Sequence, residues 1–391
     1  MLHDFQPQTV FIGALAAFVG FASSFAVVLA GLKGVGANEA EAASGLMAAA
    51  IAMGSCGIVL ALKTRMPVSV AWSTPGAALL ATGSAVESGF SAAVGAFIVC
   101  ALLIIVAGIS RPFGRAIAAI PASLANAMLA GILLSLCLAP FQAIAFDPIL
   151  GLPILLAWII GSRINRFAGV PFALLAFVAV VTLGVPFPDG WQDRLADAVV
   201  PQPVFIVPTI SVDALLGIAL PLFVVTMASQ NIPGIAVLRA NKFETPSGPL
   251  LATTGLFSLI FAPFGSHAVN LAAITAAMIS GEEAGQRRES RYTAAIVCGA
   301  LYILFGLSAG VTTAFVSLAP GILIAAVAGL ALFASFSSAA MAAFTNERDR
   351  PAAAVTFLAS ASGMSLFGVS GAFWGLLAGG LMLALLPRRT G

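Results

Sequence analysis

Charged side chains are scarce in this sequence. Asp, Glu, Lys and Arg make up 8% of its 391 residues, 60% are hydrophobic, and the mean hydropathy is +1.08. Soluble domains carry roughly 25% charged residues, so the composition excludes a soluble protein. Apolar runs recur along the whole chain. We therefore expect the first run, after Asp4, to be a membrane span rather than a cleaved export signal, and we predict an all-α polytopic membrane protein.

The residue types that build metal and nucleophilic sites are also scarce. The chain has two histidines, and its four cysteines stand singly in apolar segments without C-x-x-C spacing. Isolated cysteines of this kind are typical of small buried hydrophobes, and a catalytic site needs a nucleophile with a base or a metal cluster. We expect no catalytic residue, metal, cofactor or nucleic-acid partner. The cysteines are Cys56, Cys100, Cys137 and Cys298.

Charges, Pro/Gly clusters and Asn/Asp turns divide the chain into fourteen apolar segments. A helix needs about 20 residues to cross the hydrocarbon core of a bilayer. We therefore predict fourteen membrane spans, with their weakest joints at 262–265 and 309–312. The segments are 9–31, 42–62, 67–86, 90–109, 116–139, 148–163, 167–184, 212–236, 246–262, 265–281, 291–309, 312–344, 352–367 and 371–387.

Lys and Arg are distributed unevenly over the joints between these segments. If the N-terminus is cytoplasmic, all of the 17 Lys and Arg except Lys33 and Arg194 fall on the cytoplasmic side, as the positive-inside rule requires. We therefore predict that both termini are cytoplasmic and that the basic joints reflect topology. These joints are 63–65, 111–115, 163–166, 239–242, 287–291 and 348–350, together with the tail at 388–389.

The two halves of the chain resemble each other weakly but in order. Pro121 and Gly131 in the first half match Pro320 and Gly329 in the second, and the patch ASSF at 22–25 matches ASQN at 228–231. Each half holds seven spans, and because seven is odd the second copy enters the membrane from the opposite side. The result is an inverted repeat, which is typical of secondary transporters with a midplane site.

The third span is interrupted at its centre by Ser73, Thr74, Pro75 and Gly76. A hydroxyl followed by proline is a helix-start signal, so we predict an extended segment over 66–72 and a half-helix from Thr74 or Pro75. By the repeat, residues 264–269 form a second extended segment in the tenth span, with a half-helix near Asn270. Two helix N-termini facing one point would bind an anion. The alternative is a plain proline kink.

Polar residues gather in the eighth span and at its first-span counterpart. Ser229, Gln230 and Asn231 lie in the membrane, where such residues either face a ligand or form hydrogen bonds between helices. We predict that they face the ligand. Ser24, with Phe18 and Phe21, is the first-span counterpart and would line an aromatic ligand, although phenylalanines at this spacing also serve simple packing.

Ionisable residues are almost absent at mid-depth. His267, in the tenth span, is the exception; Glu282 follows at the cytoplasmic end of that span, and Asp213 precedes the eighth. Because a histidine titrates near neutral pH, His267 is a candidate for substrate contact or proton coupling. Glu282 and Asp213 are further proton-coupling candidates. A neutral histidine bonded to a carbonyl would give the same sequence.

The strings AWSTPGAALLA (71–81) and VTMASQNIPGIAVLRA (225–240), with the fourteen-span plan, resemble the bacterial benzoate/proton symporter (BenE) family. The plan is more remotely similar to the uracil and nucleobase–ascorbate transporters. Those relatives tend to carry acidic residues in the eighth and tenth spans. Here Gln230 or Asn231 takes the eighth-span place, which suits a substrate that is itself an anion.

The resemblance implies a division into two moving domains. A core domain would comprise residues 1–110 (spans 1–4) and 208–309 (spans 8–11), and a gate domain residues 111–207 (spans 5–7) and 310–391 (spans 12–14). It also implies a homodimer in the bacterial cytoplasmic (inner) membrane and proton-coupled uptake of benzoate or a related aromatic carboxylate. A nucleobase-type proton symporter and a passive anion channel on the same fold are the alternatives.

Overall fold

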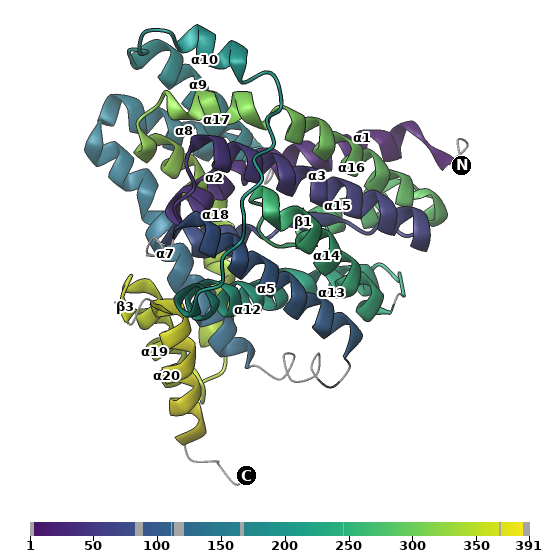
Figure 1. The fold of residues 1–391 in the computed structure, drawn as a ribbon. Helices are drawn as coiled ribbons and strands as arrows, with labels where there is room; N and C mark the ends of the chain where they lie inside the picture. Colours follow the sequence, from purple (N-terminus) through teal and green to yellow (C-terminus); the bar gives the residue numbers. More distant parts are fainter. Residues whose placement is uncertain are drawn as a thin grey trace.

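The computed structural model describes residues 4–82, 89–110, 112, 121–164, 168–244, 246–366 and 369–385. The chain in these ranges is largely helical, and β1 lies near the centre of the molecule (Figure 1). Several residues of the predicted basic joints lie outside the described ranges, namely Arg111, Arg115, Arg166, Arg388 and Arg389.

The first half of the chain contains a helix interrupted at Ser23–Ser24, a strand followed by a short helix, and several long helices. Its elements are α1 (Pro7–Ala22), α2 (Phe25–Gly34), α3 (Glu39–Thr64), β1 (Val70–Trp72), α4 (Thr74–Thr82), α5 (Phe90–Ile109), α7 (Ala122–Phe146), α8 (Pro148–Ile164), α9 (Gly169–Gly184) and α10 (Trp191–Asp197).

The second half begins with a helix that changes its hydrogen-bond pattern along its length. This helix comprises α11 (Val212–Ala214), a π-helical turn η2 (Leu215–Ala219), α12 (Leu220–Thr226), a second π-helical turn η3 (Met227–Asn231) and α13 (Ile232–Ala240). The remaining elements are α14 (Ser247–Phe261), η4 (Ala262–Phe264), β2 (Val269–Leu271), α15 (Ile274–Ser280), η5 (Glu282–Ala284), η6 (Arg288–Ser290), α16 (Tyr292–Leu307), α17 (Ala309–Ser317), α18 (Gly321–Phe344), α19 (Arg350–Ala361), β3 (Ser365–Leu366), β4 (Val369–Ser370) and α20 (Gly371–Leu385).

Among the described residues, eight helices are long and apolar enough to cross a membrane, and three more apolar helices are shorter. The protein is therefore a multi-span membrane protein, while fourteen spans stays a prediction. The predicted twelfth segment, 312–344, is wrong as a single helix. α17 ends at Ser317 and α18 begins at Gly321, because Pro320 has no N–H to continue the hydrogen-bond ladder and suits a helix start.

Helix packing divides the described chain into two groups. α3 packs along α16 and α1 along α16, α5 packs on α14, and α2 packs on α4, so helices from 7–109 and 212–307 lie together. In the other group α7 packs along α18 and α19, α8 on α9, and α19 on α20. The prolines of the predicted repeat, Pro121 and Pro320, precede α7 and α18, which are packed together.

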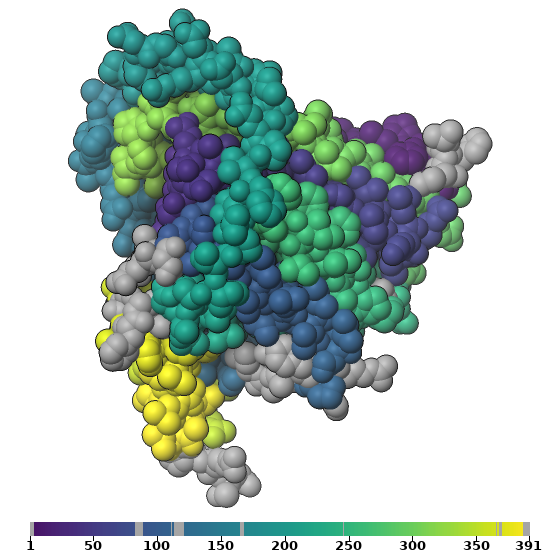
Figure 2. Space-filling view, viewed as in Figure 1, coloured from purple at the N-terminus to yellow at the C-terminus, as the bar shows by residue number. Residues whose placement is uncertain are grey.

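A segment without helix or strand over residues 201–211 crosses the outside of the first group. Figure 2 shows it as a teal column between α10 and the start of α11. Its backbone is held at three places: Val204 N–H donates to Ser44 Oγ (2.9 Å), Ile206 N–H to Pro263 O (2.7 Å) and Thr209 N–H to Ser91 O. The segment therefore belongs structurally with α3, α5 and η4.

Candidate functional site

Both predicted breaks are present, and they pair with each other. β1 and β2 form a two-stranded antiparallel ribbon with Val70 opposite Leu271 and Trp72 opposite Val269. The pairing continues past both ends, because Ser73 N–H donates to Ala268 O (2.9 Å) and Ala272 N–H donates to Ser69 O (3.0 Å). The backbone groups of a non-helical segment must be satisfied inside a membrane protein, and the ribbon satisfies them.

The start of the second half-helix differs from its prediction. α4 begins at Thr74 as expected, but α15 begins at Ile274 instead of near Asn270. Asn270 lies within β2, opposite Ala71, and the next backbone N–H, that of Leu271, donates to Asn231 Oδ1. These bonds keep the chain extended for four more residues.

The antiparallel register also places the two helix starts at opposite ends of the ribbon. α4 follows Ser73 at one end, whereas α15 follows the backbone pair of Ala272 and Ser69 at the other. Ser69 and Ser73 are four residues apart, which is on the order of 13 Å in a strand. The two helix starts are therefore about one ribbon length apart, and their convergence on one anion stays a prediction. An anion that both N-termini bind would lie between them, along the ribbon.

Ser73 is the centre of a buried hydrogen-bond network. Its Oγ accepts from Gly76 N–H (3.1 Å) and from Thr226 Oγ1 (2.8 Å), and its carbonyl oxygen lies 3.2 Å from His267 Nε2. Ser73 thus acts as the N-cap of α4 and ties it to α12. Since Pro75 has no N–H and the Gly76 N–H is engaged, Thr74 is the first-turn residue whose N–H is left for a ligand.

The polar residues of the eighth span lie in the π-helical turn η3, and they separate into two roles. Asn231 is fully buried; its Oδ1 accepts from Leu271 N–H (2.9 Å) and its Nδ2 lies 3.4 Å from Met227 Sδ. It therefore links this helix to β2. Gln230 is partly exposed, and its side-chain amide makes no hydrogen bond to another described residue. Ser229 is also partly exposed, and its Oγ donates to Val225 O.

His267 and Asn270 are fully buried beside the ribbon, and each has one polar atom without a hydrogen-bond partner among the described residues. These atoms are His267 Nδ1 and Asn270 Oδ1. Asn270 Nδ2 donates to Leu271 O (3.0 Å), and the His267 ring meets the edge of Phe97 with centroids 6.5 Å apart. Orphaned buried polar atoms are uncommon in native structures, and two of those in the described chain lie at the ribbon.

An aromatic cluster lies next to the interruption of the first span. Trp72 Nε1 donates to Ser24 Oγ (2.8 Å), and the Phe21 ring lies 5.3 Å from Trp72 and 5.2 Å from Phe305 between centroids. Phe21 and Ser24 are therefore brought to the ribbon. Phe18 is not, because 48% of its surface is exposed on the outside of α1.

The acidic candidates lie outside this cluster. Glu282 is exposed in η5, beyond the C-terminal end of α15, and Asp213 is partly exposed in the first turn of α11, which Ser211 caps through Ala214 N–H. Neither residue has a hydrogen bond or ion pair with the ribbon residues among the described contacts. As proton-coupling residues they stay predictions.

Sequence reasoning missed Trp72, Thr226 and Ser258 as site residues. Ser258 on α14 accepts from Val269 N–H (3.0 Å) and donates to Thr254 O, so it holds β2 against α14. Trp72 stands directly before Ser73 in the interrupted span, and Thr226 stands in the polar stretch of the eighth span, so the sequence context of both indicated a place at the site. Ser258 lies in an ordinary apolar run, and its sequence context gave no such indication.

The partly exposed polar side chains near the ribbon are neutral. Thr74, Ser229 and Gln230 are partly exposed, whereas Ser73, Asn231, His267 and Asn270 are buried. Hydroxyl and amide groups offer hydrogen-bond donors without the desolvation cost of a buried ammonium or guanidinium. Two interrupted helices that pair as a ribbon within an apolar bundle are typical of secondary membrane transporters.

Comparison with known proteins identifies the family. Residues 3–385 match the family model described as benzoate membrane transport protein (BenE). The chain is 40% identical over 389 residues to the inner membrane protein YdcO of Escherichia coli K12, covering 98% of this chain and 97% of that protein. It is 32% identical over 385 residues to the benzoate membrane transport protein of Acinetobacter baylyi, covering 98% and 96% respectively. The chain belongs to the BenE family of membrane transporters and is not an enzyme.

Solved structures share the fold at low identity. The transmembrane domain of the cyanobacterial bicarbonate transporter BicA aligns with a TM-score of 0.60 and 16% identity over 95% of this chain and 97% of that one. SLC26A9 aligns with a TM-score of 0.64 and 12% identity over 99% of this chain and 66% of that one.

Proposed function

We propose that this protein takes up benzoate or a related aromatic carboxylate together with a proton across the inner membrane. One observation carries the proposal. The helix start at Thr74 and the amide of Gln230 present neutral donors at an interrupted-helix ribbon, in a chain whose family includes a protein named for benzoate transport. A helix N-terminus favours a carboxylate, and an aromatic ring suits the neighbouring Phe21 and Trp72.

His267 is the proposed proton carrier. It is fully buried, its Nε2 lies 3.2 Å from the Ser73 carbonyl, and its Nδ1 has no described partner. A proton on Nδ1 would place a positive charge next to the α4 N-cap, where the carboxylate is proposed to bind. A bound anion and a bound proton would then stabilise each other, which couples their movement.

Alternating access is proposed to move the two packing groups past each other. Two groups that move as bodies should pack more extensively within themselves than against each other, and the described helices do so. α4 and α7 are in contact across the boundary between the groups. Thr82 on α4 and Met364 after α19 line the same small cavity on this boundary. A cysteine pair at these two positions, cross-linked in a background without the native cysteines, should stop transport while benzoate binding remains measurable.

The decisive experiment is uptake of radiolabelled benzoate into proteoliposomes. Symport of one proton with one monoanion is electroneutral, so an imposed pH gradient should drive accumulation and an imposed membrane potential alone should not. Salicylate should compete, whereas uracil and sulfate should not. Conductance without accumulation would favour the passive anion channel, and competition by uracil would favour a nucleobase symporter.

Two variants test the assigned roles in that assay. Gln230→Ala should weaken benzoate binding, whereas His267→Ala should preserve binding but remove its dependence on pH and abolish proton-driven accumulation. Unchanged proton-driven accumulation in His267→Ala would reject His267 as the carrier and direct attention to Glu282 and Asp213. We further propose cytoplasmic termini and a homodimer, which protease accessibility in oriented vesicles and light scattering of the detergent complex would test.

A further inference from the structure

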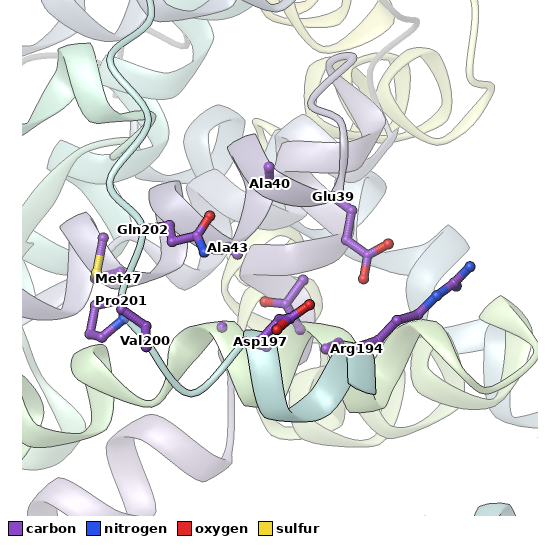
Figure 3. A pocket seen from close by; sticks show the side chains of 13 residues that line it. Glu39, Ala40, Ala43, Met47, Arg194, Asp197, Val200, Pro201 and Gln202 are labelled. Atoms are coloured by element: carbon purple, nitrogen blue, oxygen red, sulfur yellow. The ribbon is translucent and has the colours of Figure 1, made fainter. Parts of the chain in front are cut away.

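A second pocket lies away from the ribbon, at the end of the bundle where α3 begins. It has a volume of about 480 Å³ and lies between the start of α3, helix α10, the segment after it and α17. This volume is within the range of about 300–1,000 Å³ that is typical of small-molecule sites. Figure 3 shows side chains from three of these elements converging on the pocket.

The pocket has an excess of negative charge. Glu39 and Asp197 turn their carboxylates toward each other across it, while the guanidinium of Arg194 extends away from them (Figure 3). Neither carboxylate forms an ion pair or hydrogen bond with another residue in the described parts of the chain. The capping box at the start of α3 is formed by the side chains of Asn38 and Glu41, so the Glu39 carboxylate takes no part in capping the helix.

An unpartnered hydroxyl lies in the wall of the same pocket. Thr313 on α17 lines the pocket, is 0% exposed, and has no hydrogen-bond partner for its Oγ1 among the described groups. Leaving a buried hydroxyl unpaired costs free energy, and a bound ligand would supply the missing bond. The close approach of α17 to α10 that builds this wall depends on Gly310, where a Cβ would meet Ala198 O at 2.5 Å.

Apart from the amide of Gln202, the rest of the lining is apolar. Met47, Val200 and Pro201 provide apolar surface, with small alanines between them and no aromatic side chain in the lining. A ligand that suits this pocket therefore has an alkyl body and a cationic head with several N–H donors. We propose that the pocket binds a primary alkylammonium ion, whose head donates to Glu39, Asp197 and the Thr313 hydroxyl while its chain lies on the aliphatic wall.

Other ligand classes fit the lining less well. A divalent cation prefers six or more oxygen ligands, and no group of three or more His, Cys, Asp or Glu suited to a metal exists among the described residues. A quaternary ammonium is usually held by aromatic faces, which this lining lacks. A carboxylate such as benzoate would be repelled, because the pocket has two carboxylates and only one guanidinium. The site is therefore distinct from the one proposed for the transported anion.

Calorimetric titration of the full-length protein in nanodiscs with n-butylammonium chloride tests this inference, with n-butanol and calcium chloride titrated separately. We expect saturable binding of one butylammonium per chain, no saturable binding of butanol or calcium, and an affinity that falls with added salt. Thr313→Val keeps the side-chain shape but removes the hydroxyl, and it should weaken binding about tenfold or more. Asp197→Asn and Glu39→Gln alter exposed charges and should each weaken binding by roughly two- to fivefold.

Asp193→Asn is the matched control, because Asp193 lies on the same helix as Asp197, is exposed, and does not line the pocket. It should bind butylammonium like the wild type, as should Gln230→Ala, whose change lies at the ribbon. Equal weakening by Asp193→Asn and Asp197→Asn would show attraction by general surface charge and overturn the site. Saturable calcium binding that butylammonium cannot displace, or no butylammonium binding to the wild type, would also overturn it.

Discussion

Replacing Gln230 and Asn231 one at a time should separate substrate affinity from stability. Gln230 is partly exposed and its amide has no described protein partner, so Gln230→Ala should change the free energy of unfolding by about 0.5 kcal/mol or less. If its amide donates to the carboxylate, the lost charge-assisted bond is worth about 1.5–3 kcal/mol. That corresponds to a roughly ten- to hundredfold loss of benzoate affinity.

Asn231→Ala should have the opposite effect. The substitution removes the acceptor of a 2.9 Å bond from Leu271 N–H in a fully buried position. An N–H left buried without a partner costs about 1–3 kcal/mol, and the loss falls on the contact that holds η3 against β2. The protein that remains folded should bind benzoate within a few-fold of the wild type.

Both properties can be measured on the same preparations. Scintillation proximity with radiolabelled benzoate gives affinity, and thermal unfolding followed by size-exclusion chromatography gives stability. Gln192→Ala, an exposed amide on α10, is the control and should change neither. If Gln230→Ala binds like the wild type while Asn231→Ala stays stable and loses benzoate, the assignment of the two amides is reversed.

Two further predictions concern the packing of the described helices. The Tyr292 hydroxyl donates to Asp4 (2.7 Å) and holds the pKa of that carboxyl below its usual value. This hydrogen bond therefore stabilises the folded protein at pH values above the unfolded pKa near 3.9. The stabilisation is lost as the pH falls through the lower folded pKa. Tyr292→Phe should therefore raise the Asp4 pKa, measured by NMR titration of labelled aspartate, and an unchanged pKa would contradict the contact. Gly54→Ala should lower the free energy of unfolding by about 1–3 kcal/mol, because the new Cβ would meet a backbone carbonyl of α16. Gly380→Ala is the control and should not destabilise the protein, because a Cβ there meets open space. Equal thermal midpoints of the two variants would refute this prediction.

The start of α4 could be predicted because its signals are local. Ser73 caps the helix and Pro75 occupies its first turn, and both preferences arise from backbone hydrogen bonding within a few residues. The start of α15 could not be placed, since it depends on pairing between Asn270 and Ala71, which are far apart in sequence. The repeat indicated that the segment is interrupted but not where pairing ends.

The division of roles in the eighth span was also beyond sequence reasoning. A regular helix turns by about 100° per residue, so the faces of Gln230 and Asn231 would follow from their spacing to other polar residues. A π-helical turn inserts an extra residue and shifts every later side chain around the axis. Because η3 covers Met227–Asn231, that shift falls on the polar stretch itself and decides which amide is buried.

The neutral polar residues of the proposed ribbon site give a physical reason for the proposed proton coupling. Thr74, Ser229 and Gln230 provide dipoles but no positive charge, so a bound carboxylate would bring an uncompensated charge toward a core in which His267 is fully buried. A fixed Lys or Arg would compensate that charge but would also cost desolvation whenever the site is empty. A proton that arrives with the anion compensates the charge only while the anion is bound. By linkage, benzoate should then bind more tightly as pH falls, because each ligand increases the affinity of the site for the other.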